Sequence, residues 1–185
     1  MPSLIYSMSV SLDDFIADPD GNLDWSVPDE ELHRFHNERV RKLGGHVLGR
    51  RLYETMTYWE TAQEDPAATD YALEFADIWK ALPKVVFSDT LEEVVGNARL
   101  AKGTIAEEVA DLQERSGKDV GIGGADLAAE AIKLGLVDDF RLFVNPVILG
   151  GGKPFFPSLD QSVHLNLVET RTFGSSVVYL RYERV

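Results

Sequence analysis

Apolar residues fall into short runs and helical spacings that alternate over the first two thirds of the chain. Residues 4–10 form a largely apolar run of the kind found in the middle of a sheet. Shorter runs of the same type predict further buried strands at 46–48, 84–88, 98–101 and 119–122. Because strands alternate with helical segments, the pattern predicts a mainly parallel sheet with helices on its faces.

Apolar residues at helical spacing separate these strands. They predict helices at 26–43, 50–56, 71–82, 104–116 and 125–134. Ser26 stands where it can cap the first helix, and Asp29 follows at the spacing of a capping box. Thr104 and Glu107 repeat this pattern before the fourth helix.

The last third of the chain changes character. Strand-like segments occupy 139–144, 165–172 and 176–182, with a hairpin turn predicted at Phe173-Gly174-Ser175. The polar segment 57–70 predicts a loop. The sequence contains neither repeats nor linkers, so we expect a single α/β domain over residues 1–185. In this domain an antiparallel C-terminal extension completes a mainly parallel mixed sheet.

Charge and composition narrow the classes of partner. The formal net charge is −13, and such a surface repels a nucleic-acid backbone or an anionic membrane, so we expect neither as a partner. The chain has no cysteine, which excludes disulfides and thiolate chemistry. It shows neither a signal-peptide pattern nor an apolar run of roughly 20 residues, so we expect a cytoplasmic protein.

Two junctions between a strand and a helix carry glycine: Gly49-Arg50-Arg51 and Gly123-Gly124-Ala125. At the carboxyl ends of parallel strands, free N–H groups and the helix dipole favour an anion, and glycine lets a ligand approach the backbone. The two arginines add positive charge. Glycines at such turns also occur for geometry alone, and arginines in a first helical turn are often only solvated, so both interpretations stay open here. Neither a Rossmann fingerprint nor a phosphate-binding P-loop is present.

Five blocks of sequence, in order along the chain, resemble the dihydrofolate-reductase-like superfamily, and within it the reductase domain of riboflavin biosynthesis. The blocks are Ser11-Leu12-Asp13-Asp14-Phe15-Ile16-Ala17, Leu48-Gly49-Arg50-Arg51-Leu52-Tyr53-Glu54, Lys84-Val85-Val86-Phe87-Ser88-Asp89-Thr90-Leu91, Gly123-Gly124-Ala125, and Pro146-Val147-Ile148-Leu149-Gly150-Gly151-Gly152-Lys153-Pro154-Phe155-Phe156. The resemblance implies a mixed sheet of about eight strands and NADPH as cofactor.

The resemblance also assigns cofactor contacts by position. The backbone near Ser9, Ile16 and Ala17 would face the nicotinamide. Gly49, Arg50 and Arg51 would hold phosphate groups, Ser88 and Asp89 would lie by the adenine ribose, and Gly123, Gly124 and Ala125 would close over the pyrophosphate. The Gly-Gly peptide of this family is often cis, so a cis bond is expected between Gly123 and Gly124.

Three positions depart from the family pattern. Asp14 replaces a glycine of the opening motif, and Leu52 replaces a threonine whose hydroxyl would contact phosphate. Asp89 stands where many relatives carry a basic residue. Since a carboxylate repels a 2′-phosphate but accepts a hydrogen bond from a free 2′-hydroxyl, we hypothesise a reduced preference for NADPH over NADH.

Candidates for the chemistry lie on the first helix. By position Glu31 matches the proton-donating acid of dihydrofolate reductase, whereas helical periodicity points Asp29 closer to the core; either would need a pKa raised by burial. Acids in a first helical turn also simply complement the helix dipole. Trp25, Phe35 and Tyr53 are candidates for substrate binding. No metal site is expected, because His33 and His36 have no third ligand to complete a motif.

The sequence therefore predicts an NAD(P)H-dependent reductase of a small heterocyclic substrate, either pterin-like or a pyrimidine linked to a sugar. The substrate class rests on the resemblance alone. The alternatives are a pyridine-nucleotide-binding protein without turnover and an adaptor that uses its acidic surface. The C-terminal strands with Phe155-Phe156 are candidates for an apolar seam in a homodimer.

Overall fold

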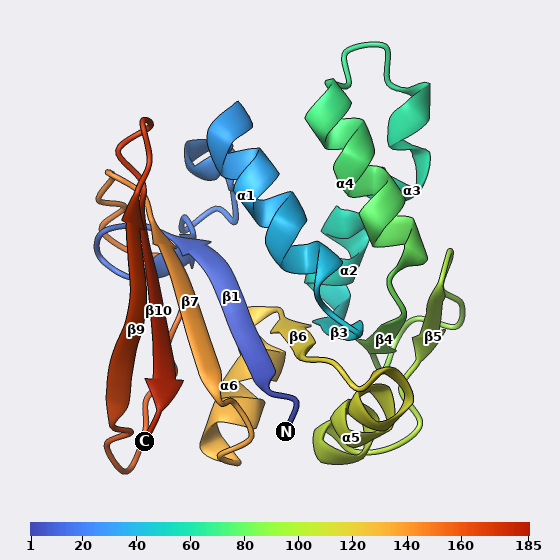
Figure 1. The fold of residues 1–185 in the computed structure, drawn as a ribbon. Helices are drawn as coiled ribbons and strands as arrows, with labels where there is room; N and C mark the ends of the chain where they lie inside the picture. The colour runs from blue at the N-terminus through green and yellow to red at the C-terminus, as the bar shows by residue number, and fades with distance from the viewer.

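A computed structural model describes residues 1–185 (Figure 1). In chain order its elements are β1 (Leu4–Val10), β2 (Phe15–Ala17), η1 (Asp24–Ser26), α1 (Glu30–Arg41), β3 (Gly45–Gly49), α2 (Arg50–Met56), α3 (Tyr58–Thr61), η2 (Ala62–Glu64), α4 (Asp70–Ala81), β4 (Lys84–Phe87), β5 (Ala98–Leu100), α5 (Ile105–Ser116), β6 (Val120–Gly123), α6 (Ala125–Lys133), β7 (Asp139–Val144), β8 (Lys153–Pro154), β9 (Leu165–Thr172) and β10 (Val178–Arg184). None of the helices combines the length and hydropathy that a bilayer crossing requires.

Eight strands form one sheet in the order β5-β4-β3-β6-β1-β7-β10-β9. The pairings from β5 to β7 are parallel, and β10 runs antiparallel to both β7 and β9. The expected mixed sheet with an antiparallel C-terminal extension is confirmed. Strands β2 and β8 form a separate antiparallel pair beside the carboxyl end of β1.

The two faces of the sheet carry different helices. On the face toward the viewer in Figure 1, α1 and α4 stand side by side, whereas α6 lies behind the sheet. The larger core lies under α5 and α6, where Tyr6, Val47 and Ile122 pack against residues of these helices. Two smaller clusters lie under α1 and α4, one around Phe35 and one around Trp79. Each face of the parallel strands is therefore covered, which explains their continuous apolar runs.

Two local predictions were wrong. Helix α1 begins after Asp29, whose carboxylate accepts from the Leu32 N–H at 2.9 Å, and Ser26 ends a separate 3₁₀ turn. Pro28 explains the difference, because it keeps Val27 extended and prevents a helix from passing through. The predicted loop 57–70 contains helix α3 and a 3₁₀ turn, which packing stabilises: the Trp59 ring lies 4.6 Å from that of Phe75.

Phe155 is not available for the apolar seam predicted for a homodimer. Phe155 is only 1% exposed and stacks on Tyr6 with ring centroids 4.2 Å apart, so it belongs to the core. The edge strand β9 does expose Leu167 and Val168. Dimerisation stays a prediction.

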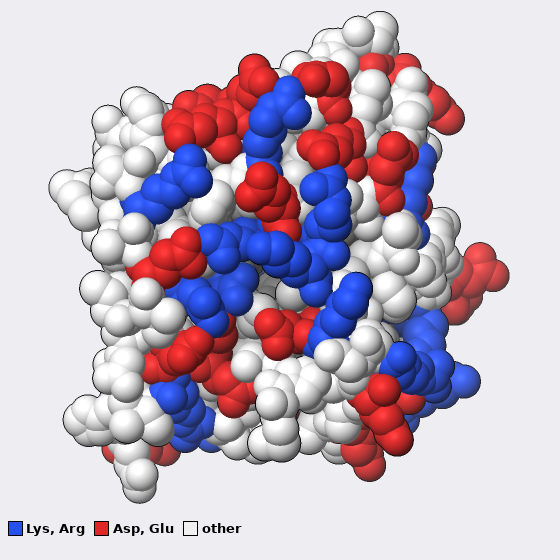
Figure 2. Space-filling view, in the orientation of Figure 1, with Lys and Arg blue, Asp and Glu red and all other residues white.

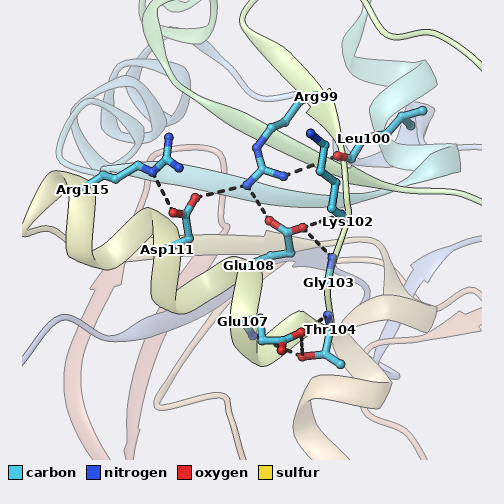
Figure 3. A network of polar contacts seen from close by, with 9 residues as sticks. All are labelled: Arg99, Leu100, Lys102, Gly103, Thr104, Glu107, Glu108, Asp111 and Arg115. Atoms are coloured by element: carbon cyan, nitrogen blue, oxygen red, sulfur yellow. Dashed lines mark hydrogen bonds and ion pairs between the residues drawn. The ribbon is translucent and has the colours of Figure 1, made fainter.

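The junction of β5 and α5 is held by a charged network (Figure 3). Glu108 bonds to the Arg99 guanidinium at 2.5 Å and accepts from the backbone N–H groups of Lys102 and Gly103 at 2.6 and 3.0 Å. The hydrogen bond from Arg99, followed by those from the backbone, lowers the pKa of Glu108 to about 2 although burial opposes the shift. The predicted capping box of Thr104 and Glu107 is confirmed beside it.

The opening loop between β1 and β2 contains an unusual backbone conformation. Asp14 has φ of 72°, in the left-handed region that favours glycine. Its carbonyl oxygen accepts from the Phe155 N–H at 2.9 Å, and burial raises the pKa of its carboxyl. The aspartate that departs from the family motif therefore occupies a position that still requires the conformation of glycine.

We predict that Glu108→Gln lowers the free energy of unfolding by about 2 kcal/mol at neutral pH, because a buried charged hydrogen bond is lost. Since the folded pKa is depressed from 4.5 to about 2, the stabilisation is complete above pH 4.5 and disappears as the pH falls toward 2. Urea unfolding at several pH values measures it, with Glu114→Gln, at an exposed position on the same helix, as control. A stability difference that stays constant down to pH 2 contradicts the assignment.

We also predict that Asp14→Gly is more stable than Asp14→Ala by about 1 kcal/mol, because only alanine retains the left-handed strain while both variants remove the carboxylate. Thermal unfolding of the two variants side by side measures the difference. Equal stability, or a more stable alanine variant, would show that Asp14 relaxes to a different backbone conformation.

Candidate functional site

A cleft of about 930 Å³ opens at the carboxyl ends of β1, β3 and β6. One wall consists of the loop after β2 together with Gly152 and Lys153, and the other of the first residues of α2 and α6. The residues predicted to bind a cofactor that line this cleft are Ile16, Ala17, Gly49, Arg50, Arg51, Gly124 and Ala125. Residues far apart in the sequence thus meet in one concave site large enough for a dinucleotide.

Glycines let the walls of the cleft approach each other closely. A Cβ at Gly124, whose φ is 93°, would lie 3.4 Å from the Cα and N atoms of Gly49, so the two glycine turns are in contact. A Cβ at Gly152, whose φ is 132°, would lie 2.0 Å from the carbonyl oxygen of Ala17. The expected cis bond is absent: the peptide between Gly123 and Gly124 is trans, and the positive φ of Gly124 makes the turn instead.

Three cationic side chains, those of Arg50, Arg51 and Lys153, line the cleft together with three carboxylates, those of Asp18, Asp126 and Glu130. Arg50 lies 3.6 Å from Glu54, whereas Arg51 has no carboxylate within ion-pair distance. Lys153 pairs with Asp126 in the first turn of α6. Helix α2 has only seven residues, so its dipole adds little, and a free guanidinium at the rim is the stronger attraction for an anion.

Four other predicted cofactor residues lie outside the lining of this cleft. Ser88 follows β4, and its hydroxyl accepts from the N–H groups of Thr90 and Leu91 at 3.1 and 3.0 Å, forming a turn. Asp89 is exposed in the same turn. Ser9 and Gly123 line a second cavity.

The second cavity, about 290 Å³, lies between the sheet and the helices α1 and α4. Its floor includes Ser7, Ser9, Gly121 and Gly123, on the two central strands. Three histidines and two arginines also line it: His33, His36, His46, Arg39 and Arg141. Met8 and Leu52 line both the cleft and this cavity, so the two hollows meet at these side chains.

The histidines of this cavity are neutral. His36 lies against Phe143 with ring centroids 4.2 Å apart, and burial lowers its pKa to about 4. Burial likewise lowers the pKa of His46 to about 4, and its Nδ1 lies 3.2 Å from the Val47 carbonyl oxygen. His33 bonds instead to Asn37 at 3.0 Å. Sequence reasoning missed this cavity; its faint signals were the helical pair His33 and His36, and an arginine inside an apolar strand.

The two predicted catalytic acids, Glu31 and Asp29, lie outside both the cleft and the second cavity. Glu31 bonds to Arg171 at 2.9 Å and accepts from the Gly174 N–H at 3.2 Å, and these contacts lower its pKa. Its side chain is 48% exposed, so the buried acid with a raised pKa that catalysis would need is not found there. Asp29 is occupied as the cap of α1.

The predicted substrate-binding residues also lie away from the cavities. Phe35 packs in an aromatic cluster beside Phe173, with ring centroids 5.2 Å apart, and is 6% exposed. Tyr53 is buried, and its hydroxyl accepts from the Val95 N–H at 2.7 Å. Trp25 donates from its indole to the Asn22 carbonyl at 3.1 Å in the loop after β2. All three side chains have structural contacts that account for their positions.

Comparison with known proteins identifies relatives along the whole chain. The uncharacterised protein YyaP of Bacillus subtilis is 35% identical over 183 residues, which cover 97% of this chain and 93% of YyaP. A putative riboflavin biosynthesis protein from Shewanella sp. PV-4 superposes with a TM-score of 0.77 at 26% identity, covering 99% of each chain. Dihydrofolate reductase from Enterococcus faecalis, solved with NADP(H), superposes with a TM-score of 0.64 at 20% identity, covering 98% of this chain and 96% of that one. The profile of the RibD C-terminal domain matches residues 2–179, and the chain belongs to that family.

Proposed function

We propose that the protein is an NAD(P)H-dependent reductase of a small heterocyclic substrate. One observation carries the proposal: a dinucleotide-sized cleft, lined by most of the predicted cofactor residues, meets a smaller, ring-sized cavity at Met8 and Leu52. Family and fold resemble reductases, and a structural neighbour was solved with NADP(H), which supports a nicotinamide cofactor here.

The residues of the cleft fit such a cofactor. The touching turns at Gly49 and Gly124 leave backbone open to a pyrophosphate, and Arg50 and Arg51 supply charge beside them. Ile16 and Ala17 line the same cleft, and by family resemblance the nicotinamide would lie against their backbone. When bound, the reduced nicotinamide supplies a hydride.

The protein's own part is orientation and exclusion of water. Met8 and Leu52 form an apolar boundary between the two hollows, so a substrate ring in the cavity would reach the cofactor through a dry passage. Hydride addition to a ring carbon must be balanced by a proton on a neighbouring nitrogen or oxygen. Because no carboxyl group lines the cavity, we assign the proton to water that reaches the cavity on the side of Ser7, which is exposed, and not through the apolar boundary at Met8 and Leu52.

We predict that Arg51→Gln raises the dissociation constant of NADPH about tenfold, because a charged hydrogen bond to phosphate contributes about 1.5–3 kcal/mol. Isothermal titration calorimetry measures it. Arg115→Gln is the control, since Arg115 is a 73% exposed arginine of α5 outside the cleft. Absence of heat with NADPH and NADH in the unaltered protein contradicts the nucleotide site. Binding without NADPH oxidation by any pterin or pyrimidine ribitol compound favours the nucleotide-binding alternative without turnover.

We further predict that NADPH and NADH bind with dissociation constants within about tenfold of each other, because the family resemblance places Asp89 by the adenine ribose, where a carboxylate would repel a 2′-phosphate. Asp89→Asn should shift the ratio of the two constants about threefold or more toward NADPH. Glu92→Gln, an exposed carboxylate shortly after it, serves as control. Strong NADPH selectivity in the unaltered protein contradicts the role given to Asp89.

A further inference from the structure

The charged side chains that line the second cavity are both arginines, Arg39 from α1 and Arg141 from β7. This contrasts with the chain as a whole, in which 31 acidic residues outnumber 18 basic ones. On the face that carries α1, Lys and Arg side chains gather around a central hollow over the gap between α1 and β1 (Figure 2). Arginine side chains therefore gather at this cavity, together with the carboxylates that pair with them, in a molecule that is acidic as a whole.

Both arginines are held in place by acids and keep unused donors. Arg141 bonds through Nε and Nη2 to the two oxygens of Asp139, both at 2.9 Å, and Arg181 shares that carboxylate at 2.8 Å. Two guanidinium groups therefore share one buried carboxylate, and Nη1 of Arg141 remains free. Arg39 bonds to Glu169 through Nη2 alone, at 2.6 Å, while its guanidinium lies 4.4 Å from the centre of the Phe35 ring.

The remaining polar groups are neutral and few. His36 forms no hydrogen bond, and its low pKa keeps it uncharged, so it can donate one N–H to a ligand. The Ser7 and Ser9 hydroxyls stand on the same face of β1 as Arg141 on its neighbour β7, because Ser7 pairs with Arg141 in the sheet register. These donors thus meet in a cavity that no carboxylate lines, because Asp139 and Glu169, which hold the two arginines, lie outside its lining.

The shape of the cavity suits a planar ring. Gly121 and Gly123 add no side chains of their own, so His46 and Leu52 lie close against the sheet, and the walls include the aromatic rings of Trp59, Trp79 and Phe143. A volume of about 290 Å³ lies at the small end of ligand pockets, the size of a compact heterocycle.

We infer that the second cavity binds a planar heterocycle that carries an anionic group and hydrogen-bond acceptors, with Arg39 and Arg141 contacting the anion. The same cavity disfavours rings with an amidine edge, such as diaminopyrimidines. Such a ring gains a proton on binding and then needs a carboxylate to pair with its positive charge, but in this cavity it meets guanidinium groups instead. The inference rests on the proposed function only in taking this cavity as the substrate site.

The test uses orotate and urate as anionic rings, uracil as the matched neutral ring, and trimethoprim as the diaminopyrimidine. Calorimetry with the full chain, with and without NADP⁺, should show orotate or urate binding at least tenfold more tightly than uracil, and trimethoprim binding less tightly than either anion. Tighter binding of trimethoprim, or no binding of either anion, overturns the inference. NADPH titrated into the same sample reports on the proposed function separately, because an anion can bind whether or not a nucleotide does.

A matched pair of variants locates the contact. Arg39→Gln should weaken binding of the anionic ring tenfold or more and leave uracil unchanged. Arg171→Gln should change neither, because Arg171 also lies over Phe35, at 5.1 Å, and pairs with a glutamate, but does not line the cavity. Should Arg39→Gln fail to fold, His36→Phe, which fills the cavity from its wall, must abolish binding of the anion. Unchanged anion binding in whichever variant folds overturns the inference.

Discussion

The arrangement of both hollows depends on the close packing that glycine permits along β6. This strand lies between β3 and β1, and its apolar side chains, Val120 and Ile122, point into the core under α5 and α6. Toward α1 it presents Gly121 and Gly123. A Cβ at Gly121 would lie 2.7 Å from the His46 ring, and one at Gly123 would lie 2.4 Å from Leu52. The imidazole and the leucine can therefore lie directly over the strand, where both line the second cavity.

The same strand leads without interruption to the cleft. Gly124 follows β6 directly and touches Gly49 at the end of β3, so the two glycine turns are fixed relative to each other by the pairing of their strands. Any side chain along this path would push β3 and β6 away from the residues that cover them. We therefore regard the cleft and the cavity as consequences of one packing constraint, and their meeting at Met8 and Leu52 as a result of it.

Sequence patterns predicted the strands well because burial on both faces leaves a continuous apolar run, which is visible without knowing the fold. The cleft was also predictable, since it forms at strand ends that glycine and arginine mark locally. The second cavity was not predictable in this way: Arg39, His46 and Arg141 come from three separate elements, and only the sheet order brings them together. The prediction that Phe35 and Tyr53 bind the substrate did not anticipate that both pack in the core. In sequence, an aromatic residue that lines a site cannot be distinguished from one that is buried behind it.

The position of Leu52 shows how a departure from a family pattern can acquire a different use. As a replacement for a phosphate-contacting threonine it removes a hydrogen-bond donor, since a methyl group cannot bond to phosphate. In the structure, however, its side chain covers Gly123 and borders both hollows. In the proposed function, a hydroxyl at this point would hold water between the nicotinamide and its substrate, whereas a leucine would exclude that water and so strengthen charge–dipole interactions there. If the proposed function holds, phosphate binding would fall to Arg51, which has no carboxylate within ion-pair distance, and the boundary between cofactor and substrate would be apolar.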